Sequence, residues 1–204
     1  MKLVCGVGVN DAGYQVEHKS YAVGEDGKVV RKLLHRCPFY ERWKDLLDRC
    51  YSGRHDAYKD CYVHSDWFLF SNFKLWMEKQ DWRGKQLDKD IILKGNKLYS
   101  PETCAFVSKT ANMFVTARDA ARGLYPIGVS FDNTRHQYLA RCRHPLEKSQ
   151  KNLGYFNTPE EAHEAWRKRK HEYAQLVAEL ETDHRVVEAL KKRYSVEEWY
   201  GNKT

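Results

Sequence analysis

The sequence has no long hydrophobic run and no closely spaced pair of cysteines. None of its apolar stretches approaches the roughly 18 residues that a membrane-spanning helix needs. The first residues, Met1-Lys2-Leu3-Val4-Cys5-Gly6, form too short an apolar stretch for a signal peptide. The Gly6-x-Gly8 pair lacks the third glycine and the following helix of a phosphate-binding loop. We therefore expect no membrane partner, a cytoplasmic location and no nucleotide loop.

The six cysteines are scattered along the chain and include no CxxC pair. In a cytoplasmic protein this pattern argues against a disulfide framework. His35, Cys37, Cys50 and Cys61 could together supply four zinc ligands, but their spacings fit no standard zinc finger. Single cysteines are commonly buried as small hydrophobic residues. We therefore expect no structural zinc.

The composition indicates a folded, basic chain. Its 204 residues leave room for one large domain or two small ones. Hydrophobic residues make up 42% of the chain and aromatic residues 13%, which allows cores to form. The mean hydropathy of -0.78 indicates that these cores are small or shared. The 35 Lys and Arg residues against 28 Asp and Glu give a net charge of +7. This charge is compatible with nucleic-acid binding, but equally with a basic surface that serves only solubility.

The N-terminal half divides into a β-rich region, 1–36, and an aromatic helical segment. Glu25-Asp26-Gly27-Lys28 lies between apolar runs and predicts a hairpin, and the residues from Val4 to Val9 predict a further strand. Pro38 is suited to the first turn of a helix, and apolar residues recur at helical spacing as far as Tyr51. A second helix is predicted over 67–79, and its aromatic stripe is interpreted as core.

The middle of the chain predicts the order strand, turn, strand, helix. The segment 85–93 is strand-like, 94–97 forms a turn, and Leu98-Tyr99 returns as a strand. The segment 100–104 then leads into a helix or a second strand, and Ala111-Asn112-Met113-Phe114 lies on the helix that closes the unit.

The C-terminal part predicts three strands followed by an amphipathic helix. The strands are expected over 123–131, 137–143 and 152–156, with a turn at Asp132-Asn133. Thr158-Pro159-Glu160-Glu161 is a capping box that opens the helix. A final short helix is expected over 183–194. Together these elements predict an α+β fold.

Two of these blocks resemble known families. The first resembles a variant of the HNH (ββα-metal) nuclease motif, carried by Leu87-Asp88-Lys89-Asp90-Ile91, Asn96, Ser100-Pro101-Glu102-Thr103-Cys104-Ala105-Phe106-Val107 and Asn112. The second resembles the AP-two DNA-binding domain, carried by Ile127-Gly128-Val129, Tyr138-Leu139-Ala140-Arg141 and Leu153-Gly154-Tyr155-Phe156 with Thr158 and Glu160-Glu161-Ala162.

The tandem order of the two blocks is similar to that of phage-encoded HNH homing endonucleases. The aromatic segment over residues 43–73 also resembles the part that precedes the HNH motif in those proteins. The resemblance implies a degenerate HNH-like region over 37–120, an AP-two-like three-stranded antiparallel sheet packed on a helix over 121–181, and a C-terminal helix over 182–204. A phage-encoded protein of this kind would act on double-stranded DNA in the host cytoplasm.

The resemblance also implies a set of catalytic residues. Asp88 and Asn112 stand at its metal-ligand positions, 112 − 88 = 24 residues apart, and Asp90 is a third candidate ligand for Mg²⁺ or Mn²⁺. Lys89 occupies the position of the signature histidine. Lysine is a poor base near pH 7 because its reference pKa is about 10.4, so Lys89 is expected to hold a phosphate instead. His64 is the candidate for a borrowed base.

Three interpretations of residues 88–112 stay open. The unit cleaves DNA with an altered site, because a metal ion can activate water with little help from a base. Alternatively, it is an inactive nuclease that grips DNA in a binding or regulatory role. In the third, Asp88 is a solvated strand residue and the resemblance is accidental.

The AP-two resemblance predicts a DNA-reading sheet. Arginine side chains in such a strand can bind guanine with two parallel hydrogen bonds. Alternate residues share a face, so Gln137, Arg141 and Arg143 lie on one side with Leu139. Lys148 and Lys151 are candidates for phosphate contacts. The alternative is a solvated sheet face of no function. The DNA-contact candidates of this block are Arg135, Gln137, Arg141, Arg143, Lys148 and Lys151.

Overall fold

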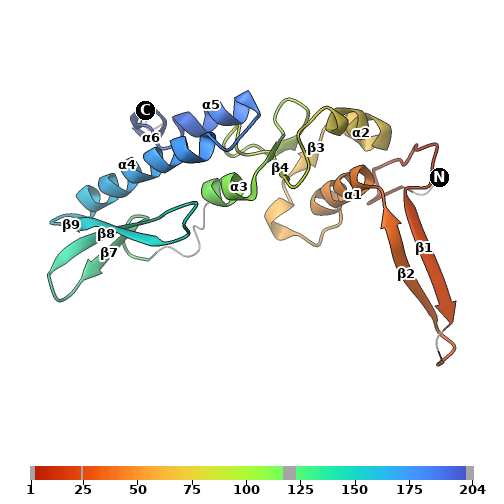
Figure 1. Ribbon diagram of the computed structural model, residues 1–204, viewed down its shortest axis with the longest axis horizontal. Coiled ribbons are helices and arrows are strands. Elements are labelled where there is room, and N and C mark those ends of the chain that lie inside the picture. Colours follow the sequence, from red (N-terminus) through yellow and green to blue (C-terminus); the bar gives the residue numbers. More distant parts are fainter. Residues whose placement is uncertain (1–2, 24, 117–122, 201–204) are drawn as a thin grey trace. The chain divides into compact units, whose positions relative to one another are not determined.

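The structure is a computed structural model that describes residues 3–23, 25–116 and 123–200 (Figure 1). It confirms a mixed α+β protein with a three-stranded antiparallel sheet. The chain divides into two compact units. The N-terminal unit comprises residues 1–82 and 95–104, and the C-terminal unit comprises 83–94 and 105–204. The predicted domain boundary between residues 120 and 121 lies outside the described residues.

The N-terminal unit begins with the predicted hairpin. Strands β1 (Glu17–Val23) and β2 (Val29–Arg36) pair in antiparallel fashion (Figure 1). Gly27 in the connecting turn has a φ of +75°, a backbone conformation that glycine adopts without strain. The expected strand over Val4–Val9 is wrong, since only isolated bridges from Val4 to Gly8 and from Val9 to Leu69 form there.

Two helices carry the aromatic core of this unit. Helix α1 (Pro38–Tyr51) begins at Pro38 as predicted, and α2 (Phe70–Glu78) follows a short 3-10 helix over Ser65–Phe68. The predicted single helix over 67–79 is interrupted because Leu69 adopts an extended backbone between the two elements. The helices bury a shared set of large side chains, which are Trp43, Leu46, Leu47, Trp67, Phe70, Phe73 and Met77. The aromatic stripe is therefore core, as predicted.

The predicted hairpin of residues 85–99 does not form. Strand β5 (Leu98–Tyr99) instead pairs in parallel with β3 (Tyr62–Val63) of the N-terminal unit. A short 3-10 helix over Asp56–Tyr58 precedes β3 in the chain. The strand expected over 85–93 shortens to β4 (Gln86–Asp88). It ends there because the Asp88 carboxylate accepts the backbone N–H groups of the two residues that turn the chain.

The C-terminal unit contains a small ββα element. Strand β4 pairs in antiparallel fashion with β6 (Ala105–Val107). Of the two predictions for the segment that follows residue 104, a helix or a second strand, the strand is the one that forms. Helix α3 (Lys109–Val115) follows, and the Ser108 hydroxyl caps it by accepting the N–H of Ala111. The order strand, strand, helix agrees with the expectation, although the paired strands are not those expected.

The predicted three-stranded sheet forms with the strand order β7-β8-β9. Its strands are β7 (Val129–Asp132), β8 (Gln137–Arg143) and β9 (Gln150–Phe156). The first strand is shorter than expected because Pro126 and Gly128, whose φ is +84°, form a turn before it.

Three helices complete the C-terminal unit. Thr158 caps α4 (Pro159–Ala178) by accepting the N–H of Glu161, as the capping box predicts. The predicted final helix is α5 (His184–Lys192), capped by Asp183, and α6 (Val196–Tyr200) follows. Among the described residues, no helix has the length and apolar character needed to cross a membrane.

Helix α4 is seated on the sheet by a close contact between Trp166 and Gly128. A Cβ atom placed on Gly128 would lie 2.1 Å from Cδ1 of the Trp166 ring. The ring is buried and also stacks on His163, with the centroids 5.3 Å apart. Any side chain at position 128 would therefore displace the central side chain of the helix–sheet interface.

We predict that Gly128→Ala destabilises the protein by about 2–4 kcal/mol, because it combines an unfavourable positive φ with overpacking against Trp166. Urea unfolding followed by tryptophan fluorescence measures the change. Gly123→Ala is the matched control, since no described atom lies within 4 Å of a Cβ at that position. Equal unfolding midpoints for the two variants would show that the contact is not a constraint.

Candidate nucleic-acid interface

The three-stranded sheet has one face covered by α4 and one face directed away from it. Cys142 of β8 belongs to the same buried cluster as Trp166 and Tyr173 of α4. Ala140 and Tyr138, at alternate positions, share its side of the strand. The remaining residues of β8, Gln137, Leu139, Arg141 and Arg143, lie on the other side of the strand, where the two arginines are exposed and Leu139 is buried.

The neighbouring strands add further residues to this outward face. Directly opposed residues of antiparallel strands share a face, so Ser130 and Tyr155 join Leu139, Asn152 joins Arg141, and Gln150 joins Arg143. We call this set the polar sheet face; its members are Ser130, Gln137, Leu139, Arg141, Arg143, Gln150, Asn152 and Tyr155. Sequence reasoning missed the contributions of β9, Gln150, Asn152 and Tyr155.

A bulge in β9 explains why they were missed. Ala140 pairs with Gly154 and Arg141 pairs with Asn152, so Leu153 is an extra residue without a partner in β8. Leu153 packs against the buried cluster under α4. A strict period of two would have placed Asn152 and Tyr155 on opposite faces. The bulge brings both onto the polar sheet face.

The arginines of this region differ in whether their guanidinium groups already have hydrogen-bond or ion-pair partners. Arg141 is exposed, and its guanidinium makes no hydrogen bond or ion pair with any described residue. Arg143 is exposed and donates from Nε to the Lys148 carbonyl at 3.1 Å. Arg135 lies in the turn after β7 and not in a strand, which corrects the prediction. Its guanidinium pairs with Asp132 and lies 4.7 Å from the centre of the Tyr155 ring.

The two predicted phosphate-contact lysines occupy different surroundings. Lys148 is exposed in the turn between β8 and β9, with a φ of +57°. Lys151 lies opposite Cys142 and therefore on the side of the sheet that faces α4. Its ammonium is 2.6 Å from a Glu147 carboxylate oxygen. Lys151 is thus not part of the polar sheet face.

The predicted catalytic residues Asp88 and Asn112 lie on β4 and α3 of the ββα element. The Asp88 carboxylate accepts the N–H groups of Asp90 and Ile91, both at 2.7 Å. Burial raises the pKa of Asp88, and these backbone hydrogen bonds partly oppose the increase. Asn112 donates its side-chain N–H to Gln86 Oε1 at 2.5 Å. Asp88 and Asn112 make no hydrogen bond to each other.

Lys89 and Asp90 form an ion pair with an N–O distance of 2.7 Å, and the Lys89 side chain is buried. Asp90 therefore already has a cation beside it. His64 belongs to the N-terminal unit, where its Nδ1 accepts the N–H of Asp66.

These residues do not fit a divalent metal centre in the arrangement observed. The Asp90 carboxylate is paired with Lys89, and Oδ1 of Asp88 accepts two backbone N–H groups. The hydrogen bond from Asn112 to Gln86 uses the amide nitrogen of Asn112 and not the oxygen that would bind a metal. Within residues 3–23, 25–116 and 123–200, no three His, Cys, Asp or Glu side chains are grouped so that they could hold a metal ion. We derive no catalytic step from this region.

The basic run Arg167-Lys168-Arg169-Lys170 of α4 wraps around the helix, as its spacing predicts. Arg167 is buried, pairs with Glu164 at 2.7 Å and donates to the Tyr194 carbonyl. Arg169 pairs with Glu172 at 2.9 Å. The Lys170 ammonium lies 3.6 Å from the centre of the Phe114 ring. The run therefore serves packing and ion pairs.

The sequence matches no protein-family model, and no curated protein or solved structure is similar enough to register as a match.

We predict that the buried side chain of Lys170 makes the free energy of unfolding depend on pH. Burial lowers its pKa to about 8, so the folded chain binds fewer protons than the unfolded chain from about pH 8 to pH 10. The free energy of unfolding should therefore gain about 1 kcal/mol from this group between about pH 8 and pH 9.5.

Lys170→Met removes the titrating group, so its free energy of unfolding should not show this increase with pH. Urea unfolding at each pH measures the difference. Lys168→Met, which replaces an exposed lysine of the same helix, is the control and should keep the slope of the parent. Parallel curves for the parent and Lys170→Met would contradict the assignment.

Proposed function

We propose that this chain is a DNA-binding protein that contacts double-stranded DNA through the polar sheet face. The observation that carries the proposal is the pair of exposed arginines, Arg141 and Arg143, at alternate positions of the central strand. Helix α4 covers the opposite face and buries the apolar residues there. The polar face is therefore available to a ligand without exposing the core.

The spacing of these side chains suits a duplex. Residues two apart in an antiparallel strand are separated by about 7 Å, which corresponds to two base-pair steps of about 3.4 Å. Arginine can bind guanine through O6 and N7, and Asn or Gln can bind adenine through N6 and N7. Asn152 and Gln150 lie directly beside Arg141 and Arg143, so each arginine has an amide neighbour. This arrangement offers two adjacent pairs of hydrogen-bonding groups to base edges.

Two further observations support the proposal. The net charge of +7 favours a polyanionic partner. Three antiparallel strands with a helix on one face also form the arrangement that the AP-two resemblance implies.

We expect Arg141→Ala and Arg143→Ala each to weaken DNA binding by about 1–3 kcal/mol, because each removes a group able to bind a base edge or a phosphate. Fluorescence anisotropy with a duplex selected from a random pool measures the affinities, at several salt concentrations between about 50 and 200 mM.

Arg169→Ala is the matched control, since it removes the same charge from the outer side of α4, where Glu172 already pairs with it. If all three variants bind as tightly as the parent throughout the salt series, the polar sheet face is not the DNA-contacting surface.

A second candidate function is hydrolysis of DNA. It is favoured by the placement of Asp88 at the end of β4 and Asn112 on α3, in the order strand, strand, helix that the HNH resemblance implies. The ion pair of Lys89 with Asp90, which places a cation beside a candidate metal ligand, favours the inactive alternative. We therefore propose binding without cleavage.

Supercoiled plasmid incubated with the protein in Mg²⁺, Mn²⁺ or EDTA should accordingly stay uncut, while a mobility shift shows that it is bound. Asp88→Ala should bind the same plasmid at least as tightly as the parent, since one negative charge is gone. Nicking by the parent in Mn²⁺ that disappears in Asp88→Ala would instead establish the nuclease.

A further inference from the structure

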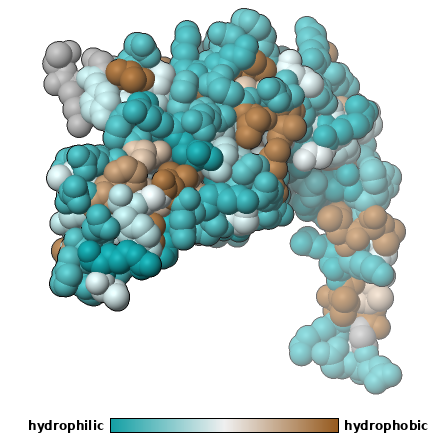
Figure 2. All heavy atoms as spheres, turned by 60° about the vertical axis from the view of Figure 1, so that its left-hand side comes forward, coloured by the Kyte–Doolittle hydropathy of each residue, from teal (hydrophilic) through white to brown (hydrophobic). Residues whose placement is uncertain are grey.

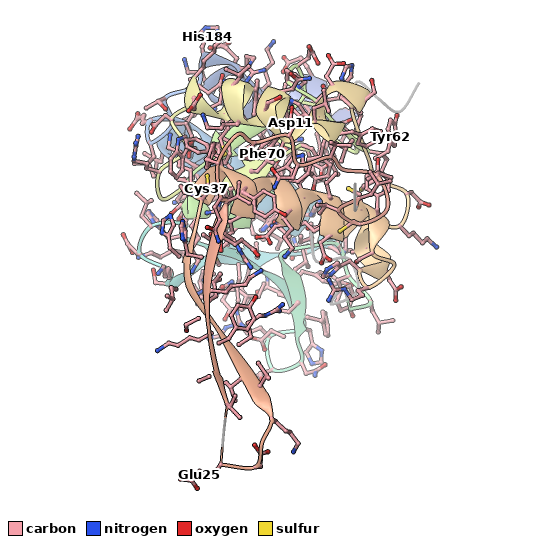
Figure 3. The ribbon with its side chains drawn as sticks, turned by 90° about the vertical axis from the view of Figure 1, so that its right-hand side faces the viewer. Asp11, Glu25, Cys37, Tyr62, Phe70 and His184 are labelled. Atoms are coloured by element: carbon pink, nitrogen blue, oxygen red, sulfur yellow. The ribbon has the colours of Figure 1, made fainter. Side chains whose placement is uncertain are left out.

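The hairpin of β1 and β2 exposes an unusual amount of apolar surface. Figure 2 shows hydrophobic side chains along it, and Figure 3 shows it extending from Cys37 at its base to Glu25 at its tip. The large apolar side chains, with exposed fractions of 42–72%, are Tyr21, Val23, Val29, Val30, Leu33 and Leu34. A two-stranded hairpin is at best marginally stable alone in water. Among the residues that the structure describes, no further strand pairs with this hairpin.

The base of the hairpin is firmly attached to its unit. Glu17 pairs with Lys19, with Arg36 at 2.7 Å and with Lys44 of α1 at 3.7 Å. The Cys37 N–H donates to the Val16 carbonyl at 2.8 Å. These contacts hold the two strands at a defined position, while the strands beyond them stay exposed.

The tip of the hairpin disfavours insertion into DNA or contact with an anionic membrane. Glu25 and Asp26 lie there, and only Asp26 has a cation beside it, Lys28 at 3.0 Å. Acidic groups at the leading end would approach phosphates at an electrostatic cost. A protein strand is the better partner, because it can use both the apolar side chains and the unpaired backbone groups of an edge.

The two edges of the hairpin are not equivalent. Strand β2 carries a bulge, because His18 pairs with His35 while Lys19 pairs with Leu33, which leaves Leu34 unpaired. It also carries two adjacent cations, Arg31 and Lys32. Bulges and charges are the features that protect edge strands from pairing. Strand β1 has no extra residue, so its edge is the one suited to accept another strand.

We propose that β1 pairs in antiparallel fashion with β1 of a second copy of this chain, centred on Ser20, to form a four-stranded sheet in the order β2-β1-β1-β2. Ser20 is the midpoint of Glu17–Val23, so this register pairs all seven residues of the strand. It places Lys19 opposite Tyr21, which allows a cation–π contact on each side of the two-fold axis. Glu17 lies opposite Val23, and no like charges face each other.

Other symmetric registers are less favourable. A pairing centred on Lys19 would set the two Lys19 side chains against each other, and one centred on Tyr21 would bring Glu17 opposite Glu25. Directly opposed like charges destabilise strand pairing. A symmetric pairing of β2 centred on Arg31 or on Lys32 would set that cation against its own copy. The β1 pairing is also closed, since both copies use the same edge and two chains complete the assembly.

This inference is independent of the DNA-binding proposal, and two measurements test it. The first uses Ser20→Cys with a short bifunctional thiol reagent, which should give a covalent dimer because the two residues face each other across the axis. Lys32→Cys is the matched control, since three strand spacings of about 4.8 Å would separate its two copies. The parent, which has six cysteines of its own, gives the background. No cross-linking of Ser20→Cys above that background would overturn the register.

The second measurement is sedimentation equilibrium over a range of concentrations. The parent should form dimers, and Ser20→Glu should weaken the dimer at least about tenfold by placing two carboxylates in opposition. Ser20→Thr should keep the dimer, and thermal unfolding checks that both variants fold as the parent does. A parent that stays monomeric throughout, or a Ser20→Glu variant that dimerises as the parent does, would refute the proposal.

Discussion

The contact between the Trp166 ring and the bare Cα of Gly128 is the constraint on which the C-terminal unit depends. It allows α4 to lie close against the sheet, and His163 extends the contact by binding the Ile127 carbonyl at 2.9 Å. Tyr194 and Trp199 pack around the same indole. Because helix α4 buries apolar residues of the sheet on this side, the opposite face can carry arginine and amide side chains. The polar sheet face is thus a consequence of how well its reverse is packed.

The features that the sequence predicted correctly are those set by local chemistry. The turn at Glu25–Lys28 with its glycine, the helix start at Pro38 and the capping box at Thr158 each depend on a few neighbouring residues. The two faces of β8 followed from simple alternation, because that strand contains no extra residue. Alternation therefore places Arg141 and Arg143 on the same side of the strand.

The errors arose where distant residues decide the outcome. Leu98-Tyr99 was predicted as the return strand of a local hairpin, yet it pairs with Tyr62-Val63, which is distant in the sequence and belongs to the same unit. The strand expected over 85–93 ends at Asp88, because its carboxylate accepts the N–H groups of Asp90 and Ile91 where the chain turns. The bulge at Leu153 reassigns the faces of β9, and a pattern of alternation cannot reveal it. In each case the residue type was compatible with both roles, and only its partners distinguish them.

The distribution of positive charge shows why composition alone does not indicate the proposed interface. The densest basic run, residues 167–170, lies on α4 and is engaged by Glu164, Glu172 and aromatic rings. Arg141 and Arg143 are separated in the sequence by a buried cysteine, yet they lie side by side on one flat face. A charge attracts a polyanion strongly only when no nearby carboxylate neutralises it. The arginines on which the DNA-binding proposal rests are therefore isolated in the sequence, because the strand, rather than the run, brings them together.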